Sequence, residues 1–311
     1  MDLDRSRGDG VLTLVGEQAK VNERAAARAH GAMLLFAALI SMSFTLGDLA
    51  APYIEPSVLT TARFALAAVI MGALAAPRIA WDHVTQGWRY PVLGGLLAAY
   101  FVLMFEALRL TDPVSTGAVF TLTPIMSAVF GYLLMRQITK PGVAFALLLA
   151  GAGAVWVIFR ADVEAMLGLE LGFGERIFLI GCACHALYTP MGRLLHRGEP
   201  LTVYTFFGLC GGLLVTALYS NSAIIDTDWS GLPWIAWAGI LYLGIVTTAG
   251  TFFLVQYATL SLPAAKVMAY GYLVPVFIIL WEGVLGHGWV APVVWLGAAA
   301  TTGAMLMLLR E

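Results

Sequence analysis

Four charged residues interrupt long apolar stretches of this chain: Asp48, Arg63, Glu106 and Glu282. A charge near the centre of a bilayer costs about 2.5–3.5 kcal/mol on insertion scales, so such residues usually face a cavity or a partner. On the topology derived below, all four fall in the outer part of a membrane, which predicts a charge-paired cluster around Arg63. The cluster is either a structural salt bridge or an outer gate. A further alternative is that it meets the ends of a zwitterionic solute, since a guanidinium holds a carboxylate bidentately.

A histidine lies near the middle of a later apolar stretch, close to two cysteines. At 100° per residue along a helix, Cys182 and His185 share a face, whereas Cys184 points elsewhere. Two ligands do not complete a zinc site, so we expect no metal and no cofactor. His185 is expected to be neutral and to line a cavity or bond a neighbouring helix. Proton coupling through His185 stays an alternative, because histidine ordinarily titrates near neutral pH.

Three prolines lie inside apolar stretches: Pro124, Pro190 and Pro275. Each removes a backbone hydrogen bond, and a membrane tolerates the freed carbonyls only where protein buries them or a wet cavity adjoins them. We therefore expect helix bends that shape a central cavity, with plain packing kinks as the alternative. Polar and aromatic residues form the predicted cavity wall: Tyr100, Phe101, Thr121, Thr123, His185, Tyr188, Trp237, Tyr242, Tyr270 and Tyr272.

These residues occupy segments long enough to cross a bilayer. The chain has 311 residues, of which 60% are hydrophobic and 12% charged. A soluble domain carries about a quarter charged residues, so this surface must face lipid. A span needs about 20 apolar residues, and breaks, most of which contain proline, separate ten such segments. The predicted helices are 31–51, 57–76, 90–110, 113–135, 141–160, 174–195, 201–219, 232–257, 263–285 and 289–309.

Basic residues are distributed unequally between the two sets of connections. With the N-terminus inside, 13 lysines and arginines lie near the inner ends of the spans and 3 near the outer ends. The positive-inside rule then places both termini in the cytoplasm. The net charge of −2 argues against a nucleic acid or another polyanion as partner. The expected partners are the lipid bilayer and a small-molecule solute.

The ten segments form two runs of five with matching landmarks. Glu55-Pro56 opens the second segment and Glu199-Pro200 opens the seventh, 144 residues later, and Pro124 matches Pro275 with a slightly longer offset. Because five is odd, the second run must be inverted relative to the first. Inverted repeats build transporters with a solute site between the halves. The sequence therefore predicts an all-α polytopic membrane protein, with ten transmembrane helices as two inverted five-helix repeats around a central cavity.

The domain organisation follows from this repeat. Residues 1–30 are expected to form a cytoplasmic tail, either a short interfacial helix or disordered. Residues 31–160 are the first repeat, 161–173 an extracytoplasmic linker, and 174–311 the second repeat. Arg63 aligns with Phe207, so its charge belongs to one half alone, which favours a role in binding or gating over shared architecture.

Small residues mark places where helices approach closely. Gly208 and Gly212 make a GxxxG pair, and Gly94-Gly95 lies in the third segment. Such faces more often pack helices within one chain than join subunits. A monomer is therefore expected, and a dimer stays open.

Several segments, taken in their order and spacing, resemble the EamA-type branch of the drug/metabolite transporter superfamily, over about residues 30–310. They are Pro56-Ser-Val-Leu-Thr-Thr-Ala-Arg63-Phe-Ala-Leu-Ala, Leu110-Thr-Asp-Pro-Val-Ser-Thr-Gly-Ala-Val-Phe-Thr-Leu-Thr-Pro124, Ala186-Leu-Tyr-Thr-Pro-Met-Gly-Arg193 and Tyr272-Leu-Val-Pro-Val-Phe277. The chain departs from the family where the fourth and ninth spans usually end in Gly-Glu, since it has Arg136-Gln137 and His287-Gly288. A common Trp of the first and sixth spans is replaced by Ser41 and His185. The roles of those family groups do not carry over.

The resemblance implies a secondary transporter most similar to the bacterial amino-acid exporters, including the aromatic amino-acid exporter. We expect export of small amphipathic metabolites, chiefly amino acids, by alternating access across the bacterial inner membrane. The alternative is another small metabolite or a cationic drug, moved in either direction. No P-loop, HExxH or G-x-S-x-G motif occurs, so an enzyme is not expected. A membrane scaffold would not need an arginine and carboxylates at matched depth.

Overall fold

The computed structural model describes residues 3–80, 82–168, 171–259, 261–262 and 264–310. All regular structure in these ranges is helical, and ten segments are long and apolar enough to cross a membrane, which confirms the expected fold class. The spans are Arg24–Ala50, Pro56–Arg78, Arg89–Leu108, Pro113–Met135, Pro141–Ile158, Phe173–Leu195, Leu201–Tyr219, Trp234–Val255, Lys266–Val284 and Pro292–Arg310.

Some spans are single helices and others are composite. The elements of the first half are α1 (Leu3–Ala50), α2 (Pro56–Ala75), η1 (Ala76–Arg78), α3 (Asp82–Thr85), α4 (Arg89–Leu108), α5 (Pro113–Phe120), α6 (Thr123–Met135), α7 (Pro141–Ile158) and α8 (Val163–Gly168). Those of the second half are α9 (Phe173–Leu195), α10 (Leu201–Tyr219), α11 (Asn221–Asp226), α12 (Trp234–Leu241), η2 (Tyr242–Gly250), α13 (Thr251–Thr259), α14 (Ala264–Ala269), η3 (Tyr270–Leu273), α15 (Val274–Val284), η4 (Pro292–Val294) and α16 (Trp295–Arg310).

Proline sets the start of several helices. Pro56, Pro113 and Pro141 open α2, α5 and α7, where the missing N–H costs nothing and the fixed φ suits the first turn. Asp112 caps α5, because its carboxylate accepts a hydrogen bond from the backbone N–H of Ser115 at 3.0 Å. At the other end of the same span, Arg136 adopts φ 53° and ends α6 in a left-handed turn.

The fourth, eighth and ninth spans are interrupted. α5 ends at Phe120 and α6 begins at Thr123, so the break lies directly before Pro124. In the ninth span the 3₁₀ turn η3 lies directly before Pro275. The eighth span contains the π-helical segment η2. By contrast, α9 continues unbroken past Pro190 to Leu195.

Helix pairing follows the two-repeat organisation. α2 packs against α10 and α7 against α16, and each pair joins equivalent helices of the two halves. α4 packs against α9, and in the matching arrangement η2 and α13 pack against α1. A Cβ on Gly94 would lie 2.0 Å from the backbone nitrogen of Gly212, so α4 and α10 touch backbone to backbone. The expectation that these glycines pack helices within the chain agrees with this contact.

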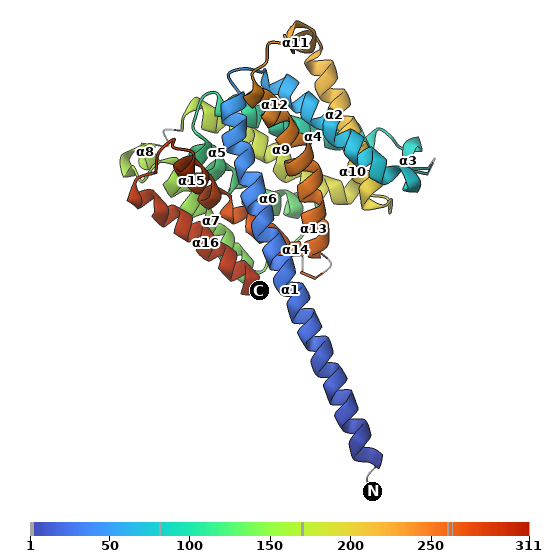
Figure 1. The fold of residues 1–311 in the computed structure, drawn as a ribbon. Coiled ribbons are helices and arrows are strands. Elements are labelled where there is room, and N and C mark those ends of the chain that lie inside the picture. The colour runs from blue at the N-terminus through green and yellow to red at the C-terminus, as the bar shows by residue number, and fades with distance from the viewer. Residues whose placement is uncertain (1–2, 81, 169–170, 260, 263, 311) are drawn as a thin grey trace.

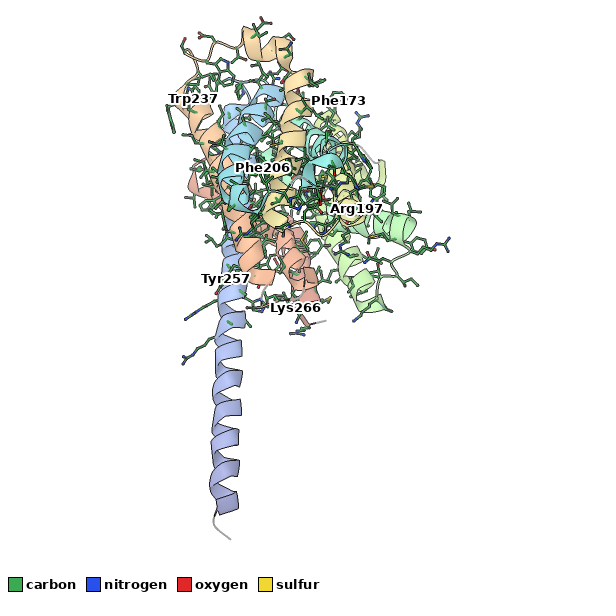
Figure 2. All side chains as sticks on the ribbon, turned by 90° about the vertical axis from the view of Figure 1, so that its right-hand side faces the viewer. Phe173, Arg197, Phe206, Trp237, Tyr257 and Lys266 are labelled. Carbon is green, nitrogen blue, oxygen red and sulfur yellow. The ribbon has the colours of Figure 1, made fainter. Side chains whose placement is uncertain are left out.

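Both chain ends lie on the same side of the helical bundle (Figure 1). Trp237 and Phe173 lie at the opposite end of the bundle from Lys266 (Figure 2). No break marks the expected boundary of the tail at residue 30, because α1 is one helix from Leu3 into the first span. The N-terminal part of α1 projects beyond the bundle in Figure 1.

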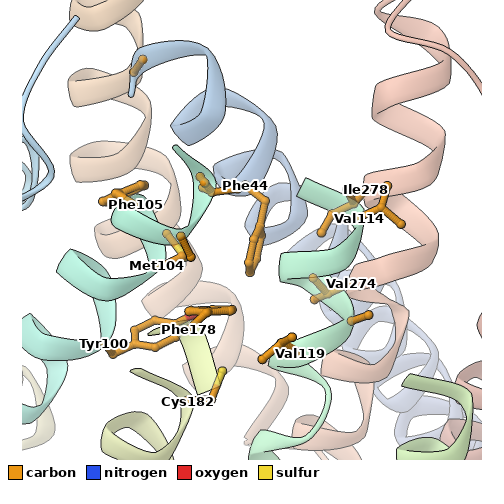
Figure 3. Close-up of a cluster of buried hydrophobic side chains, with 14 of the residues drawn as sticks. Phe44, Tyr100, Met104, Phe105, Val114, Val119, Phe178, Cys182, Val274 and Ile278 are labelled. Carbon is orange, nitrogen blue, oxygen red and sulfur yellow. The ribbon is translucent and has the colours of Figure 1, made fainter. Parts of the chain in front are cut away.

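A buried apolar cluster closes the end of the bundle opposite to the chain termini. It joins side chains of α1, α4, α5, α9 and α15, among them Phe44, Tyr100, Phe105, Val119, Phe178 and Ile278 (Figure 3). Helix α5 approaches α15 closely here, since a Cβ on Gly117 would lie 2.2 Å from Cδ1 of Ile278. α5 and α15 belong to different repeats, so this packing holds the two halves together at that end.

Candidate functional site

A cavity of about 330 Å³ lies between the two halves. Its walls come from the interrupted fourth and ninth spans and from α7, α9 and α16. Exposed Gln137 and Arg193 belong to its lining, at the end of the bundle where the chain terminates. The cavity is thus reached from that end, while the apolar cluster closes the other.

Three buried polar atoms of lining residues have no hydrogen-bond partner of ordinary geometry among the described residues: Thr123 Oγ1, His185 Nδ1 and Tyr272 Oη. Thr123 has beside it the thiol of Cys182, which is a weak hydrogen-bonding group. A buried polar atom left without a partner costs about 1–3 kcal/mol. The three atoms come from the fourth, sixth and ninth spans, so one small polar molecule between them would satisfy groups of both halves.

The helix breaks place two of these groups. Thr123 opens α6 directly before Pro124, and Tyr272 lies in η3, three residues before Pro275. Neither proline supplies an N–H, so the backbone around each break departs from the regular helical pattern. This local irregularity is tolerated within a membrane where protein buries it or a cavity adjoins it.

One face of α9 supplies a stripe of lining residues. His185, Thr189 and Arg193 recur at intervals of four residues and all line the cavity. Thr189 and Arg193 are absent from the wall predicted from the sequence. The four-residue spacing from His185 is the signal that would have found them. Phe120, at the end of α5, also lines the cavity.

The predicted wall residues fall into two groups. Thr121, Thr123, His185 and Tyr272 line the cavity. Tyr100, Phe101, Tyr188, Trp237, Tyr242 and Tyr270 are not part of its lining. For Tyr242 the reason is that its hydroxyl donates to the carbonyl of Leu39 at 2.9 Å. The Tyr270 hydroxyl lies 2.7 Å from Nδ1 of His30, and Trp237 is 41% exposed beside Trp229. Of the prolines predicted to bend helices, Pro124 and Pro190 belong to the lining.

Neighbouring aromatic rings, tilted against one another, form a row behind the cavity wall, which we call the aromatic stack. The rings of His185 and Tyr100 have centroids 4.6 Å apart, and those of Tyr100 and Phe101 lie 4.8 Å apart. The ring of Tyr188 is nearly parallel to that of His185, with centroids 6.3 Å apart. Tyr100 and Phe101 therefore support His185 rather than face the cavity themselves.

Arg63 lies at the far end of this stack. Its Cζ is 3.6 Å from the ring centroid of Phe101. Its Nε donates to Thr248 Oγ1 at 2.9 Å, and its Nη2 lies 3.4 Å from Thr247 Oγ1. The residue is 2% exposed, and Nη1 has no hydrogen-bond partner in the described part of the chain.

The expected ion pair between Arg63 and a carboxylate is not formed among the described residues. Glu282 accepts a hydrogen bond from Thr45 at 2.7 Å and lies 2.9 Å from Nδ1 of His287. Glu106 lies 3.8 Å from Arg109. Asp48 is half-buried, and no described side chain hydrogen-bonds it.

A difference in depth accounts for the absence of this ion pair among the described residues. Asp48, Glu106 and Glu282 all lie in the last turn of their helices. Arg63 is seven residues beyond the start of α2, whereas each carboxylate is two residues from the end of its own helix. At 1.5 Å per residue, Arg63 therefore lies about 7 Å deeper.

A second cavity, of about 320 Å³, lies at the opposite end of the bundle. Asp112, Arg160, Glu282 and His287 line it, and Arg160 lies 2.7 Å from Asp112. Burial alone would raise the pKa of Asp112, but the Ser115 N–H and the Arg160 guanidinium outweigh it and lower that pKa. Asp112 therefore stays ionised beside Arg160. The apolar cluster lies between the two cavities.

Comparison with known proteins gives one family. A sequence model described as "EamA-like transporter family" matches residues 28–159 and residues 172–310. The "Uncharacterized transporter YyaM" of Bacillus subtilis (strain 168) is 24% identical over 255 residues, covering 78% of this chain and 81% of that protein. The "Uncharacterized transporter YetK" of the same organism is 24% identical over 190 residues, covering 60% of this chain and 56% of that protein. A solved structure described as "Crystal structure of protein" shares the fold, with a TM-score of 0.63, 20% identity and coverage of 92% of this chain and 98% of the other.

Proposed function

This chain belongs to the EamA-like transporter family, and from that premise we propose that it exports small amphipathic metabolites, chiefly amino acids with aromatic ones among them, by alternating access. It is a multi-pass membrane protein and a transporter. The two matched segments correspond to the two five-helix repeats.

One observation supports the choice of solute above the others. The central cavity combines an apolar wall with three buried polar atoms that have no ordinary partner among the described residues: Thr123 Oγ1, His185 Nδ1 and Tyr272 Oη. A purely apolar solute would leave all three unsatisfied, and a strongly hydrophilic one would be desolvated against apolar walls. A small molecule with an apolar side chain and a few hydrogen-bonding groups fits both conditions, and amino acids have this character.

The two ends of the bundle support alternating access. The central cavity is reached from the side of the chain termini, and the apolar cluster between α5 and α15 closes the opposite side. The breaks before Pro124 and Pro275 lie in the same two spans that form this closure. Rocking of the halves about these breaks would part α5 from α15 and expose the cavity to the other side.

The charge distribution supports the direction of transport. The excess of basic residues at the span ends near both termini supports a cytoplasmic location for that side. The cavity then loads its solute from the cytoplasm of a bacterial inner membrane, which is the starting point of an export cycle.

Counterflow in proteoliposomes tests the proposal. Purified protein is reconstituted with unlabelled L-phenylalanine inside, and uptake of labelled L-phenylalanine is compared with uptake of labelled uridine and labelled tetraphenylphosphonium. We expect exchange of the amino acid above that of empty liposomes. Exchange of uridine or the cation alone would contradict the amino-acid assignment, and no exchange of any probe would contradict the proposal as a whole.

A further inference from the structure

We propose that Arg63 and the adjoining π-helical threonines form a carboxylate-recognition site on the solute pathway. This inference rests on the proposed function and adds to it the class of solute: one that carries a carboxylate next to an apolar group. The carboxylate would take the free N–H groups of Nη1 and Nη2 when the solute passes beyond the cavity seen here.

The hydrogen bonds of Arg63 leave part of its guanidinium unused. Nε donates to Thr248 Oγ1 at 2.9 Å, and Nη2 lies 3.4 Å from Thr247 Oγ1. A guanidinium has five N–H groups. Both N–H groups of Nη1 and one of Nη2 are therefore without a hydrogen-bond acceptor in the described part of the chain. Nη1 and Nη2 together present the two-pronged edge that a carboxylate fits.

The two threonines stabilise the cation without neutralising it. Thr247 Oγ1 donates to the carbonyl of Leu243 at 3.0 Å, and Thr248 Oγ1 donates to the same carbonyl at 2.8 Å. Each hydroxyl proton is thus used, and the oxygen lone pairs remain for Arg63. The full positive charge stays in a site that is 2% exposed.

Arg89 provides an internal comparison, since it is also 2% exposed. Its guanidinium bonds the carboxylate of Glu199 at 2.9 Å and the carbonyl of Gln86 at 3.2 Å, and it also donates to the carbonyl of Leu195. A buried arginine with a structural role is thus ion-paired and hydrogen-bonded in this protein. Arg63 has no such counter-charge among the described residues, which fits a site whose anion arrives with the solute.

Two asymmetries between the repeats meet at this site. The residue of the second half that aligns with Arg63 is Phe207. The π-helical segment η2 lies in the eighth span, whereas the equivalent third span, α4, is a regular α-helix. Because of the π-helical turn, the consecutive residues Thr247 and Thr248 both bond the carbonyl of Leu243, and both also accept hydrogen bonds from Arg63. Such π-helical segments occur frequently at functional sites.

The aromatic stack connects this site to the cavity. Phe101 covers the face of Arg63 at 3.6 Å, Tyr100 follows Phe101, and His185 of the cavity wall follows Tyr100. Phe101 is half-buried and supplies a cation–π contact, which is weaker than a bidentate carboxylate. A solute that displaces Phe101 would replace the cation–π contact of Arg63 with a stronger bidentate bond to the solute carboxylate.

Three probes separate the charged groups of such a solute. L-Phenylalanine carries a carboxylate and an amine, 3-phenylpropionate carries the carboxylate alone, and 2-phenylethylamine carries the amine alone. Each is tested as an unlabelled competitor of L-phenylalanine counterflow in proteoliposomes. We expect wild-type protein to be inhibited by 3-phenylpropionate at concentrations about tenfold lower than by 2-phenylethylamine, since a charge-assisted bond contributes at least that factor.

The variant Arg63→Gln should abolish this preference for the carboxylate, and Arg63→Lys should restore part of it. Arg176→Gln is the matched control, because Arg176 also lies over a phenylalanine ring, Phe173, but is exposed at the outer end of α9. If Arg63→Gln does not fold, Arg63→Lys decides the question instead, because it keeps the charge but loses the two-pronged edge and should retain only part of the wild-type preference.

The outcomes separate the two proposals. Counterflow of L-phenylalanine that both competitors inhibit equally, or an unchanged ratio in Arg63→Gln, would overturn the Arg63 site and leave the proposed function standing. A wild-type protein that exchanges no probe at all would contradict both.

Discussion

Arg89 and Glu199 form a buried ion pair, with Arg89 Nη1 and Glu199 Oε1 2.9 Å apart and the side chains 2% and 1% exposed. Arg89 opens α4 of the first half, and Glu199 lies between α9 and α10 of the second. Arg89 also donates to the carbonyl of Leu195, at the C-terminal end of α9. This pair therefore joins the two repeats at the end of the bundle where the cavity opens.

Glu199→Gln should destabilise the protein by about 3 kcal/mol, because it leaves the buried charge of Arg89 without its partner. The measurement is the thermal or denaturant unfolding of the purified protein in detergent. Arg160→Ala is the control, since the Arg160–Asp112 pair has a 71% exposed arginine and should contribute at most about 1 kcal/mol. Equal losses of unfolding free energy in the two variants would show that burial does not increase the contribution of the Arg89–Glu199 pair to stability.

Stability should depend on acid through the same pair. Burial of Glu199 would raise the pKa of its carboxyl, but the backbone N–H groups of Glu199 and Arg197 and the charge of Arg89 outweigh this and lower the pKa below the ordinary 4.5. The contribution is therefore complete above about pH 4.5 and is lost as the pH falls through the lowered pKa of the folded state. The melting temperatures of wild type and Glu199→Gln should converge below pH 4.5. A constant difference between pH 7 and pH 3 would contradict this.

The positions of the helix breaks could be read from the sequence because proline acts locally. Pro124 and Pro275 interrupt their spans, whereas α9 continues without a break past Pro190, and the two breaks supported the prediction that Thr123 and Tyr272 line a cavity. The rotation of a helix about its own axis depends on its neighbours instead. Tyr242 and Tyr270 were assigned to the wall by composition, yet their hydroxyls bond Leu39 and His30 of α1.

The surroundings of Arg63 were beyond sequence reasoning for a similar reason. The charge of Arg63 predicted a carboxylate partner, but its hydrogen-bond partners are Thr247 and Thr248. No sequence motif predicts the π-helical segment that directs both threonines toward Arg63. Which partner a buried side chain meets depends on its depth and on the rotation of each helix about its own axis. A π-helical turn changes that rotation without changing the hydropathy of the segment.

Tyr272→Phe should weaken solute binding about tenfold while leaving the fold intact. The Tyr272 hydroxyl is buried and has no protein partner among the described residues, so its removal deletes a bond to the solute and no bond within the protein. Counterflow affinity and melting temperature are measured together. Tyr132→Phe is the control, because Tyr132 is 59% exposed on α6. A large loss of stability in Tyr272→Phe with unchanged affinity would assign the hydroxyl to the fold instead.

Gly94→Ala should prevent stable folding, whereas Gly208→Ala should be tolerated. A Cβ on Gly94 would lie 2.0 Å from the Gly212 nitrogen and 2.5 Å from the Gly208 carbonyl oxygen, and both obstacles are backbone. A Cβ on Gly208 meets nothing within 4 Å in the described structure, and alanine is favoured over glycine in a helix by about 1 kcal/mol. Yield and thermal stability of the purified variants measure the difference. A Gly94→Ala protein as stable as Gly208→Ala would show that α4 and α10 are not held in backbone contact.

Thiol labelling should report which side of the membrane each cavity faces. After replacement of Cys182, Cys184 and Cys210, a cysteine in place of Thr189 lies in the cavity near the chain termini, and one in place of Asp112 lies in the opposite cavity. If both termini are cytoplasmic, a membrane-impermeant maleimide should label Thr189→Cys in inside-out vesicles and Asp112→Cys in intact cells. Val119→Cys is the control, since Val119 is 1% exposed within the apolar cluster between the cavities. The opposite labelling pattern would reverse the assigned orientation.

Added L-phenylalanine should protect Thr189→Cys from labelling, because a solute held by Thr123, His185 and Tyr272 occupies the same cavity. Labelling of Val119→Cys that rises with added solute would directly report the opening of the closed side.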